Sequence, residues 1–139
     1  MYKASVFRYF IALVLVGLLL VPADCFAQQK EIVITVKRID GGKIVGPWRE
    51  ARVFGFNTLV KAHTFERAYE DSIKNHSYFI MDESMYDLYD CTDEEGVCVM
   101  SLPPTGYIVV VCYPYPPRKI AIRGRKEIEV NMEMYLVCG

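Results

Sequence analysis

The feature that most constrains the fold is the stretch from Thr92 to Val111, which reads TDEEGVCVMSLPPTGYIVVV. It contains an acidic turn, a short alternating strand, a Pro-Pro-Thr-Gly turn and a second strand. In the acidic turn, Asp93 is expected to bond its own backbone and Gly96 to adopt a positive φ. The second strand is apolar on both faces, because Ile108 and Val110 alternate with valines on the opposite side. Strands of this kind are buried on both faces, so this strand is predicted to lie at the centre of the domain.

Strand signals recur before and after this stretch. Four further segments are rich in β-branched residues or alternate between apolar and polar: Glu31 to Arg38, Ala51 to Phe56, Lys119 to Arg123 and Ile128 to Leu136. Gly and Pro turns separate these segments, and Gly55 inside one of them predicts a bulge or a close backbone approach. Short strands with frequent turns and little helix predict an all-β fold, a single immunoglobulin-like Greek-key sandwich of about seven strands.

A long insertion, residues 57–90, interrupts the strand pattern. Thr64 is the candidate N-cap of a short helix in which Phe65, Tyr69 and Ser72 share one face with Ala68 and Ile73. The rest of the insertion is rich in aromatic residues. We expect it to return to strand at Tyr78 to Met81 and at Ser84 to Cys91.

The first 27 residues have the layout of a secretory signal peptide. Lys3 and Arg8 precede an uncharged apolar run that ends at Pro22. This run is shorter than the roughly 20 residues needed to span a bilayer. We therefore expect cleavage after Ala27, export to the periplasm, cell surface or medium, and a single domain at residues 28–139 with no transmembrane segment. A lipoprotein alternative would acylate Cys25, although the acidic residue before it is unfavourable.

The charges are unevenly distributed along the chain. The formal net charge is −1, so nothing in the overall balance indicates a nucleic-acid partner. Between residues 62 and 95, however, acidic residues far outnumber Arg67 and Lys74, whereas the charged residues between 112 and 126 are all basic. We expect these two regions to be complementary, either within the domain or toward a partner.

Four cysteines remain after the predicted cleavage, namely Cys91, Cys98, Cys112 and Cys138. An even number in an exported protein permits disulfides, and the absence of a C-x-x-C spacing argues against a zinc ribbon. Cys91 and Cys98 flank the acidic turn and form the candidate disulfide. The alternative is that Cys98 and Cys138, which fall on inward faces by alternation, are buried thiols.

The insertion also supplies a candidate surface for a partner protein or a glycan. Its aromatic residues lie among acidic ones: Tyr69, Tyr78, Phe79, Tyr86 and Tyr89. Rings offer rigid apolar area and carboxylates accept hydrogen bonds from hydroxyl groups, a combination that suits both kinds of ligand. The alternative, which we favour, is that these rings pack the insertion onto the sandwich, because the insertion has few aliphatic residues.

Catalytic and metal-binding motifs are missing from the sequence. His63 and His76 are its only histidines, and no motif places a serine or cysteine beside either of them. The acidic residues between Asp87 and Glu95 offer oxygen ligands for calcium, but their spacing does not match an EF-hand loop. We therefore predict that the protein is not an enzyme and has no cofactor or metal site.

Five segments carry a resemblance to a known family: Asp40-Gly41-Gly42, Ala51-Arg52-Val53, Thr92-Asp93 with Gly96, Pro104-Thr105-Gly106-Tyr107, and Ile128 to Leu136. Together they resemble the carboxypeptidase regulatory-like, transthyretin-like domain of exported Bacteroidetes proteins. The resemblance covers most of residues 28–139 apart from the insertion, and Glu50 and Cys98 depart from the family pattern. It implies a transthyretin-like sandwich that serves as an accessory module, and it implies little about function.

These observations predict an exported, non-enzymatic binding or interaction module that meets an envelope protein or a glycan through its insertion. The alternative is a structural or assembly component of a cell-envelope complex, docking by the edge of one of its sheets. The sequence leaves the identity of the ligand and the oligomeric state open.

Overall fold

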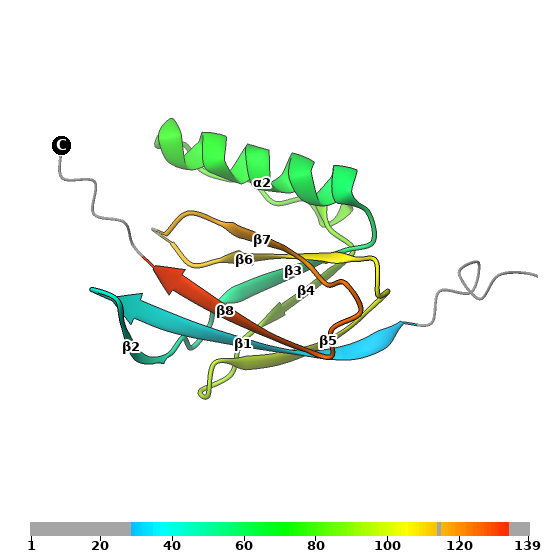
Figure 1. Ribbon diagram of the computed structural model, residues 1–139. Coiled ribbons are helices and arrows are strands. Elements are labelled where there is room, and N and C mark those ends of the chain that lie inside the picture. The colour runs from blue at the N-terminus through cyan, green and yellow to red at the C-terminus, as the bar shows by residue number, and fades with distance from the viewer. Residues whose placement is uncertain (1–28, 114, 134–139) are drawn as a thin grey trace, which may run out of the picture.

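The computed structural model describes residues 29–113 and 115–133, which form two stacked sheets and one long helix (Figure 1). The strands are β1 (Lys30–Asp40), β2 (Lys43–Pro47), β3 (Arg52–Phe56), β4 (Leu88–Cys91), β5 (Val97–Leu102), β6 (Tyr107–Val111), β7 (Arg118–Ala121) and β8 (Glu127–Glu133). The helix α2 (Leu59–Lys74) and the 3₁₀ turn η2 (Glu83–Met85) both lie in the insertion. The predicted all-β sandwich is therefore confirmed.

The first sheet, which we call sheet A, is built around β1. Strands β5 and β2 pair antiparallel with successive halves of β1, and β8 pairs with it in parallel. Because β8 overlaps both β5 and β2 along β1, it must lie on the opposite side of β1 from them. A bulge at Val45 of β2, opposite the step from Arg38 to Ile39, interrupts the pairing of β1 with β2.

The second sheet, which we call sheet B, is antiparallel with the order β4-β3-β6-β7. Its inner face packs against sheet A through apolar residues of both sheets, among them Ile34, Val36, Val53, Ile108, Val110 and Val130. Its outer face is covered by α2, which buries a second cluster that includes Phe54, Phe56, Phe65, Val109 and Val111. Figure 1 shows the resulting three layers, with α2 on the side of sheet B remote from sheet A. The prediction that β6 is covered on both faces is thus confirmed.

The sequence does not predict β2, which raises the number of strands to eight among the described residues. The Gly46-Pro47 pair argues against a strand in the sequence, because proline has no amide hydrogen to donate to a neighbouring strand. The strand forms because Gly41 and Gly42 adopt φ values of 60° and 79° and close a tight hairpin after β1.

The predicted start of the helix is wrong, although its buried face is partly right. The helix begins at Leu59 after the N-cap Thr58, whose side chain accepts from the amide of Lys61. Thr64 lies inside the helix and donates to the carbonyl of Val60. The residues that α2 buries are Ala62, Phe65, Tyr69 and Ser72. The predicted strand at residues 78–81 is not formed, and in the second predicted segment only β4 is a strand.

The acidic turn has the predicted geometry. The Asp93 carboxylate accepts from the amides of Glu95 and Val97, at 2.9 and 3.0 Å. Gly96 has a φ of 76°, and a Cβ there would lie 2.6 Å from the carbonyl oxygen of Val36. Gly55 makes the predicted close approach, to Leu102 of the other sheet.

The predicted signal peptide at residues 1–27, the alternative lipidation residue Cys25, and Cys138 lie outside the described residues. Within the described part of the chain, no helix is long and apolar enough to cross a membrane.

Candidate functional site

Four of the five aromatic residues of the predicted partner surface pack within the protein. Phe79 stacks edge-on against Tyr69 at a ring-centroid distance of 5.3 Å, and Tyr69 is only 8% exposed. The rings of Tyr86 and Tyr89 lie 5.2 and 5.0 Å from that of Phe54. Tyr78, in contrast, is 98% exposed. The rings therefore hold the insertion on sheet B, and a partner surface on the insertion stays a prediction in which Tyr78 is the open ring.

A shallow groove of about 390 Å³ separates the first turns of α2 from η2. It is lined by Thr58, Val60, Lys61, Thr64, Phe65, Ser84 and Met85. Among the residues that line it, Val60 is 77% exposed. Elsewhere in the insertion, Tyr78 and Ile80 are also open to solvent.

Asp87 joins the two ends of the insertion. Its carboxylate lies 2.7 Å from the ammonium of Lys61 and accepts from the amide of Asn57 at 2.8 Å. Partial burial raises the pKa of Asp87, but the Lys61 and Asn57 hydrogen bonds and the Lys61 charge more than offset this, so that pKa lies below its usual value. Asp87 is thus an ionised clamp between the start of α2 and the segment that enters β4.

Thr92 links the loop before β3 to the acidic turn. Its hydroxyl donates to the carbonyl of Trp48 at 2.6 Å and accepts from the amide of Ala51 at 2.8 Å. The Thr92 amide also donates to the carbonyl of Ala51, and the residue is 3% exposed. This buried threonine therefore has a structural role that sequence reasoning missed, since its partners are about forty positions away along the chain.

The predicted disulfide between Cys91 and Cys98 is not formed, and both residues are free thiols. Cys91 pairs with Arg52 in the register of β3 and β4, in which Tyr89 pairs with Phe54. It therefore lies on the helix side of sheet B, whereas Cys98 points into the core between the sheets. Burial raises the pKa of Cys98, and likewise that of Cys112, to about 12, so both thiols stay protonated and unreactive.

The two histidines are not brought to a cysteine or to an acidic cluster. The His63 ring lies 3.2 Å from the Lys119 ammonium on the surface, and His76 lies just after α2 with a φ of 49°. Within residues 29–113 and 115–133, no three His, Cys, Asp or Glu side chains are grouped to hold a metal ion. The acidic residues considered for calcium are separated instead, with Asp87 in its clamp and Asp93 in its turn.

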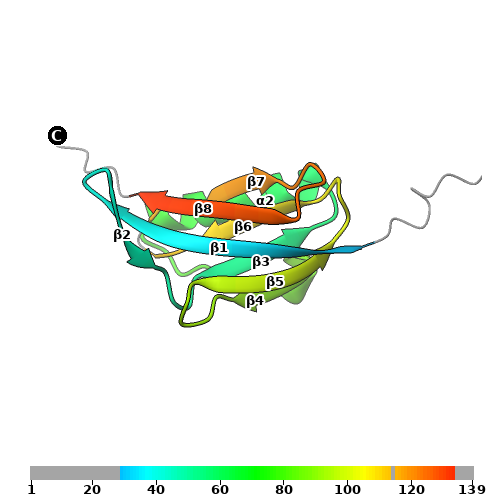
Figure 2. The ribbon, with the colours of Figure 1, turned by 60° about the horizontal axis from the view of Figure 1, so that its bottom comes forward.

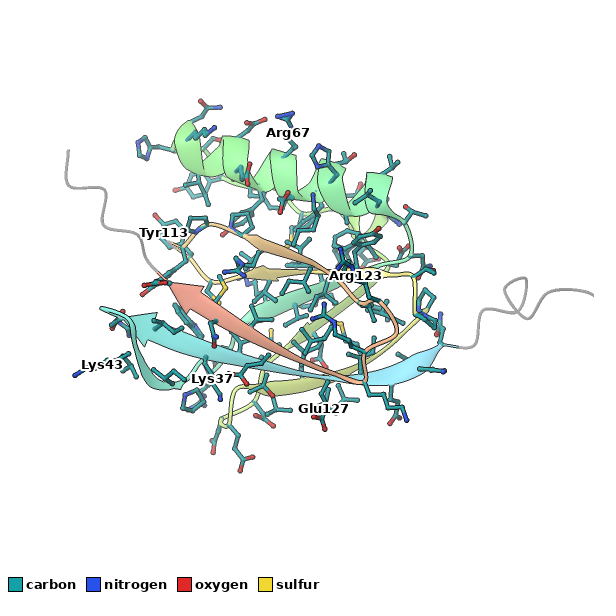
Figure 3. The ribbon with its side chains drawn as sticks, viewed as in Figure 1. Lys37, Lys43, Arg67, Tyr113, Arg123 and Glu127 are labelled. Atoms are coloured by element: carbon teal, nitrogen blue, oxygen red, sulfur yellow. The ribbon has the colours of Figure 1, made fainter. Side chains whose placement is uncertain are left out.

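Part of the predicted charge complementarity is internal. Lys119 of the basic region lies 3.1 Å from Glu66 on α2, so β7 and the helix are held together by an ion pair. Arg67 projects into solvent from the far side of α2, while Arg123 lies in the loop before β8 (Figure 3). The basic loop before β8 therefore stays exposed.

The edge strands of the two sheets are the remaining candidate sites, and β5 differs from the other edge strands in its lack of charge. Its sequence, VCVMSL, contains no charged residue and no proline. Its outer face carries Val99, which is 49% exposed, and no element among the described residues covers that face of sheet A. Uncharged edge strands of this kind are templates for pairing with another chain.

Comparisons with known proteins yield similar structures but no family. No family model matches the sequence, and no curated protein is similar to it. The N-terminal domain of the shaft pilin SpaA of Lactobacillus rhamnosus GG is 11% identical, with a TM-score of 0.45 over 78% of this chain and 95% of that one. The basal pilin SpaB of the same organism is 8% identical, with a TM-score of 0.43 over 78% and 98%.

A longer structure of the SpaA shaft pilin is also similar. It is 12% identical, with a TM-score of 0.42 over 76% of this chain. The chain spans 48% of the length of that pilin. At these scores, the two sheets of the present structure define its fold and the neighbours add no functional assignment.

Proposed function

We propose that the protein is a non-enzymatic assembly component of the cell envelope that docks to other proteins through the edge of sheet A. One observation carries this proposal: the insertion uses most of its rings to cover sheet B, whereas β5 in sheet A keeps an uncharged edge open. Strand addition suits such an edge, because main-chain hydrogen bonds supply affinity and alternate side chains supply specificity.

Export and family membership belong to the same proposal. The layout of residues 1–27 supports secretion. Asp93 and Gly96 support the resemblance to carboxypeptidase regulatory-like domains, since they build the turn in one of the five segments that carry it. Members of that family act mainly as accessory modules, which agrees with a docking role.

A second candidate function is partner binding at the groove beside η2. Val60, which lines the groove, is 77% exposed, and Tyr78 and Ile80 in the segment between α2 and η2 are 98% and 85% exposed. Exposed apolar side chains in the same part of a chain are candidates for an interaction site. This function would use the insertion and leave β5 unoccupied.

Capture of partners from envelope extracts of the source organism separates the two functions. The tagged wild-type protein is compared with Val99→Pro, which alters the β5 edge, and with Tyr78→Ser/Ile80→Ser, which alters the insertion. We expect a specific partner to be lost with Val99→Pro and retained with the double variant. Loss with the double variant alone would favour the insertion, and retention by both would exclude both the β5 edge and the Tyr78–Ile80 segment.

A further inference from the structure

The direction of the backbone groups in β5 follows from the bonds at its first residue. The Val97 amide donates to the Asp93 carboxylate at 3.0 Å, and the Val97 carbonyl accepts from the Asp93 amide at 2.9 Å. Asp93 lies outside β1, so the groups of Val97 point away from β1. Opposite Val99, the amide of Val33 donates to Lys126 on the β8 side. Since alternate residues of an antiparallel strand face alternate sides, Val99 and Ser101 also point away from β1.

These two residues form a short window of unpaired groups. Among the described residues, no hydrogen bond is formed by the amide or carbonyl of Val99 or Ser101 on that side. The positions that flank the window are already satisfied or cannot donate. Val97 is bound by Asp93, and Pro103 has no amide hydrogen while its carbonyl accepts from Gly106 at 2.9 Å. The window is therefore symmetric about Met100.

The edges at the other ends of the two sheets are protected against pairing. In β8, Glu127, Glu129 and Glu133 place acidic residues at alternate positions, and the Asn131 carbonyl accepts from the Arg118 guanidinium at 3.3 Å. In β7, the Arg125 guanidinium donates to the carbonyl of Ala121. Charged residues on an edge and caps on its carbonyls are the usual means of preventing strand addition.

The edges next to β5 are protected as well. Strand β4 is four residues long and carries Asp90, while β2 has a bulge and ends at Pro47. Short strands, bulges and prolines all limit pairing. Among the described edge strands, only β5 combines an unbroken register with the absence of charge, so it is the edge at which a strand can add.

We propose that this strand comes from a second copy of the chain, with β5 pairing antiparallel to β5 across a two-fold axis at Met100. The inference rests on the proposed edge docking and names its occupant. In this register Val99 lies opposite Ser101 of the second copy, and the two residues exchange amide-to-carbonyl hydrogen bonds on each side of the axis. Val97 lies opposite the second copy's Pro103, so the two positions that have no free donor face each other.

Charge selects the same pairing. If β8 paired with itself, its glutamates would be brought together, and self-pairing of β7 would oppose Arg118 and Lys119 of both copies. Like charges directly opposite each other destabilise a sheet, and β5 has none. The neighbouring β4 runs along the same side of the sandwich (Figure 2), so its partly exposed Leu88 would border the interface. Two copies of sheet A then form one continuous sheet.

Sedimentation velocity of the purified protein over a concentration series tests the pairing. The wild type is expected to form a reversible dimer, and Val99→Pro to stay monomeric, because proline removes an edge donor without touching the β1 ladder. Glu129→Pro is the matched control, since by alternation from Asn131 its amide also points away from β1, but on the β8 edge. Circular dichroism verifies that each variant is folded.

A second variant keeps the amide and changes only the charge. Val99→Lys retains every backbone donor but places a lysine on each side of the axis, so the dimer is expected to weaken and to weaken more at low salt. If Val99→Pro does not fold, Val99→Lys shows whether β5 forms the dimer interface. A dimer with unchanged affinity in Val99→Lys would exclude β5 from the interface.

The register is tested by crosslinking in a Cys91→Ser/Cys138→Ser background. A mixture of Val99→Cys and Ser101→Cys chains is expected to form disulfide-linked heterodimers faster than either chain alone forms homodimers. Opposed residues of an antiparallel pair lie at a Cα separation of about 5.5 Å, which a disulfide can bridge. Faster homodimers of either chain would place the axis elsewhere.

The outcomes separate this inference from the proposed function. A wild type that is monomeric at every concentration, but loses its envelope partner in Val99→Pro, overturns the second copy as occupant and keeps edge docking. A dimer that survives Val99→Pro and Val99→Lys overturns the β5 pairing. If partner capture also survives both variants, the proposed function fails as well.

Discussion

The two sheets of this domain differ in what covers them. Sheet B is enclosed on both faces, by sheet A on one side and by α2 with the insertion's rings on the other. Sheet A is enclosed on one face only, among the described residues, and its β5 edge is open. The difference teaches that a long aromatic insertion can serve as core for the sheet beside it. Among the described residues, the face that stays uncovered therefore belongs to sheet A.

Removing a ring from the covered side of sheet B should have the largest effect on stability. Phe54 is 1% exposed and its ring packs against those of Phe65, Tyr86 and Tyr89. We expect Phe54→Ala to lower the free energy of unfolding by about 3–5 kcal/mol, measured by urea denaturation. Val99→Ala, on the open face of sheet A, should cost at most about 0.5 kcal/mol. Similar losses would mean that the two faces are equally covered.

A substitution of Gly96, in the turn before β5, should have the next largest effect on stability. A Cβ at this position would collide with the carbonyl of Val36, and its φ is positive. We expect Gly96→Ala to cost roughly 3 kcal/mol in the same measurement. Gly41→Ala is the matched control, because Gly41 also has a positive φ but no atom lies within 4 Å of a Cβ there. Equal costs would show that backbone strain alone explains the loss.

The buried hydroxyl of Thr92 should contribute less. Thr92→Val keeps the shape of the side chain but leaves the amide of Ala51 and the carbonyl of Trp48 without their partner. We expect a loss of roughly 2 kcal/mol in the free energy of unfolding. Thr92→Ser retains the hydroxyl and should recover most of this loss. A loss in Thr92→Ser as large as in Thr92→Val would attribute the effect to the methyl group.

The Asp87 clamp should have the smallest effect, and a pH-dependent one. Because the pKa of Asp87 is lowered in the folded protein, its ionised form favours folding. This contribution is complete above the unfolded-state pKa of about 4 and disappears as the pH falls through the lower folded-state value. We expect Asp87→Asn to cost roughly 0.5–1 kcal/mol at neutral pH.

Thermal unfolding of the wild type, Asp87→Asn and the exposed-residue control Asp71→Asn across acidic pH checks this prediction. The difference between wild type and Asp87→Asn should shrink as the pH falls, whereas Asp71→Asn should follow the wild type. A difference that is constant with pH would show that the clamp acts through packing and not through its charge.

Local patterns of sequence predicted a large share of the fold. The two-faced apolar pattern of β6, the alternation of β8 and the Asp93–Gly96 turn all depend on neighbouring residues, and each is present. The helix start was misplaced because Thr58 and Thr64 are both acceptable caps, and packing on sheet B selects the longer helix. Strand β2 was missed because it has a bulge at Val45 and ends at Pro47, and both features interrupt the local strand pattern.

The candidate site could not be derived in the same way. The disulfide prediction used proximity along the chain, but Cys91 and Cys98 are separated by sheet B itself. The open edge of β5 could not be predicted either. The sequence shows that the strand is uncharged, but it does not show which side of the strand pairs with a neighbour.

The sequence by itself therefore determined which segments are strands with a buried face, because side-chain alternation is a local property. Only the tertiary structure decided that the insertion's rings cover sheet B and that Val99 and Ser101 have backbone groups without a partner in the described part of the chain. The reason is physical. Every strand has the same amides and carbonyls, and whether they are satisfied depends on which distant segment lies beside them.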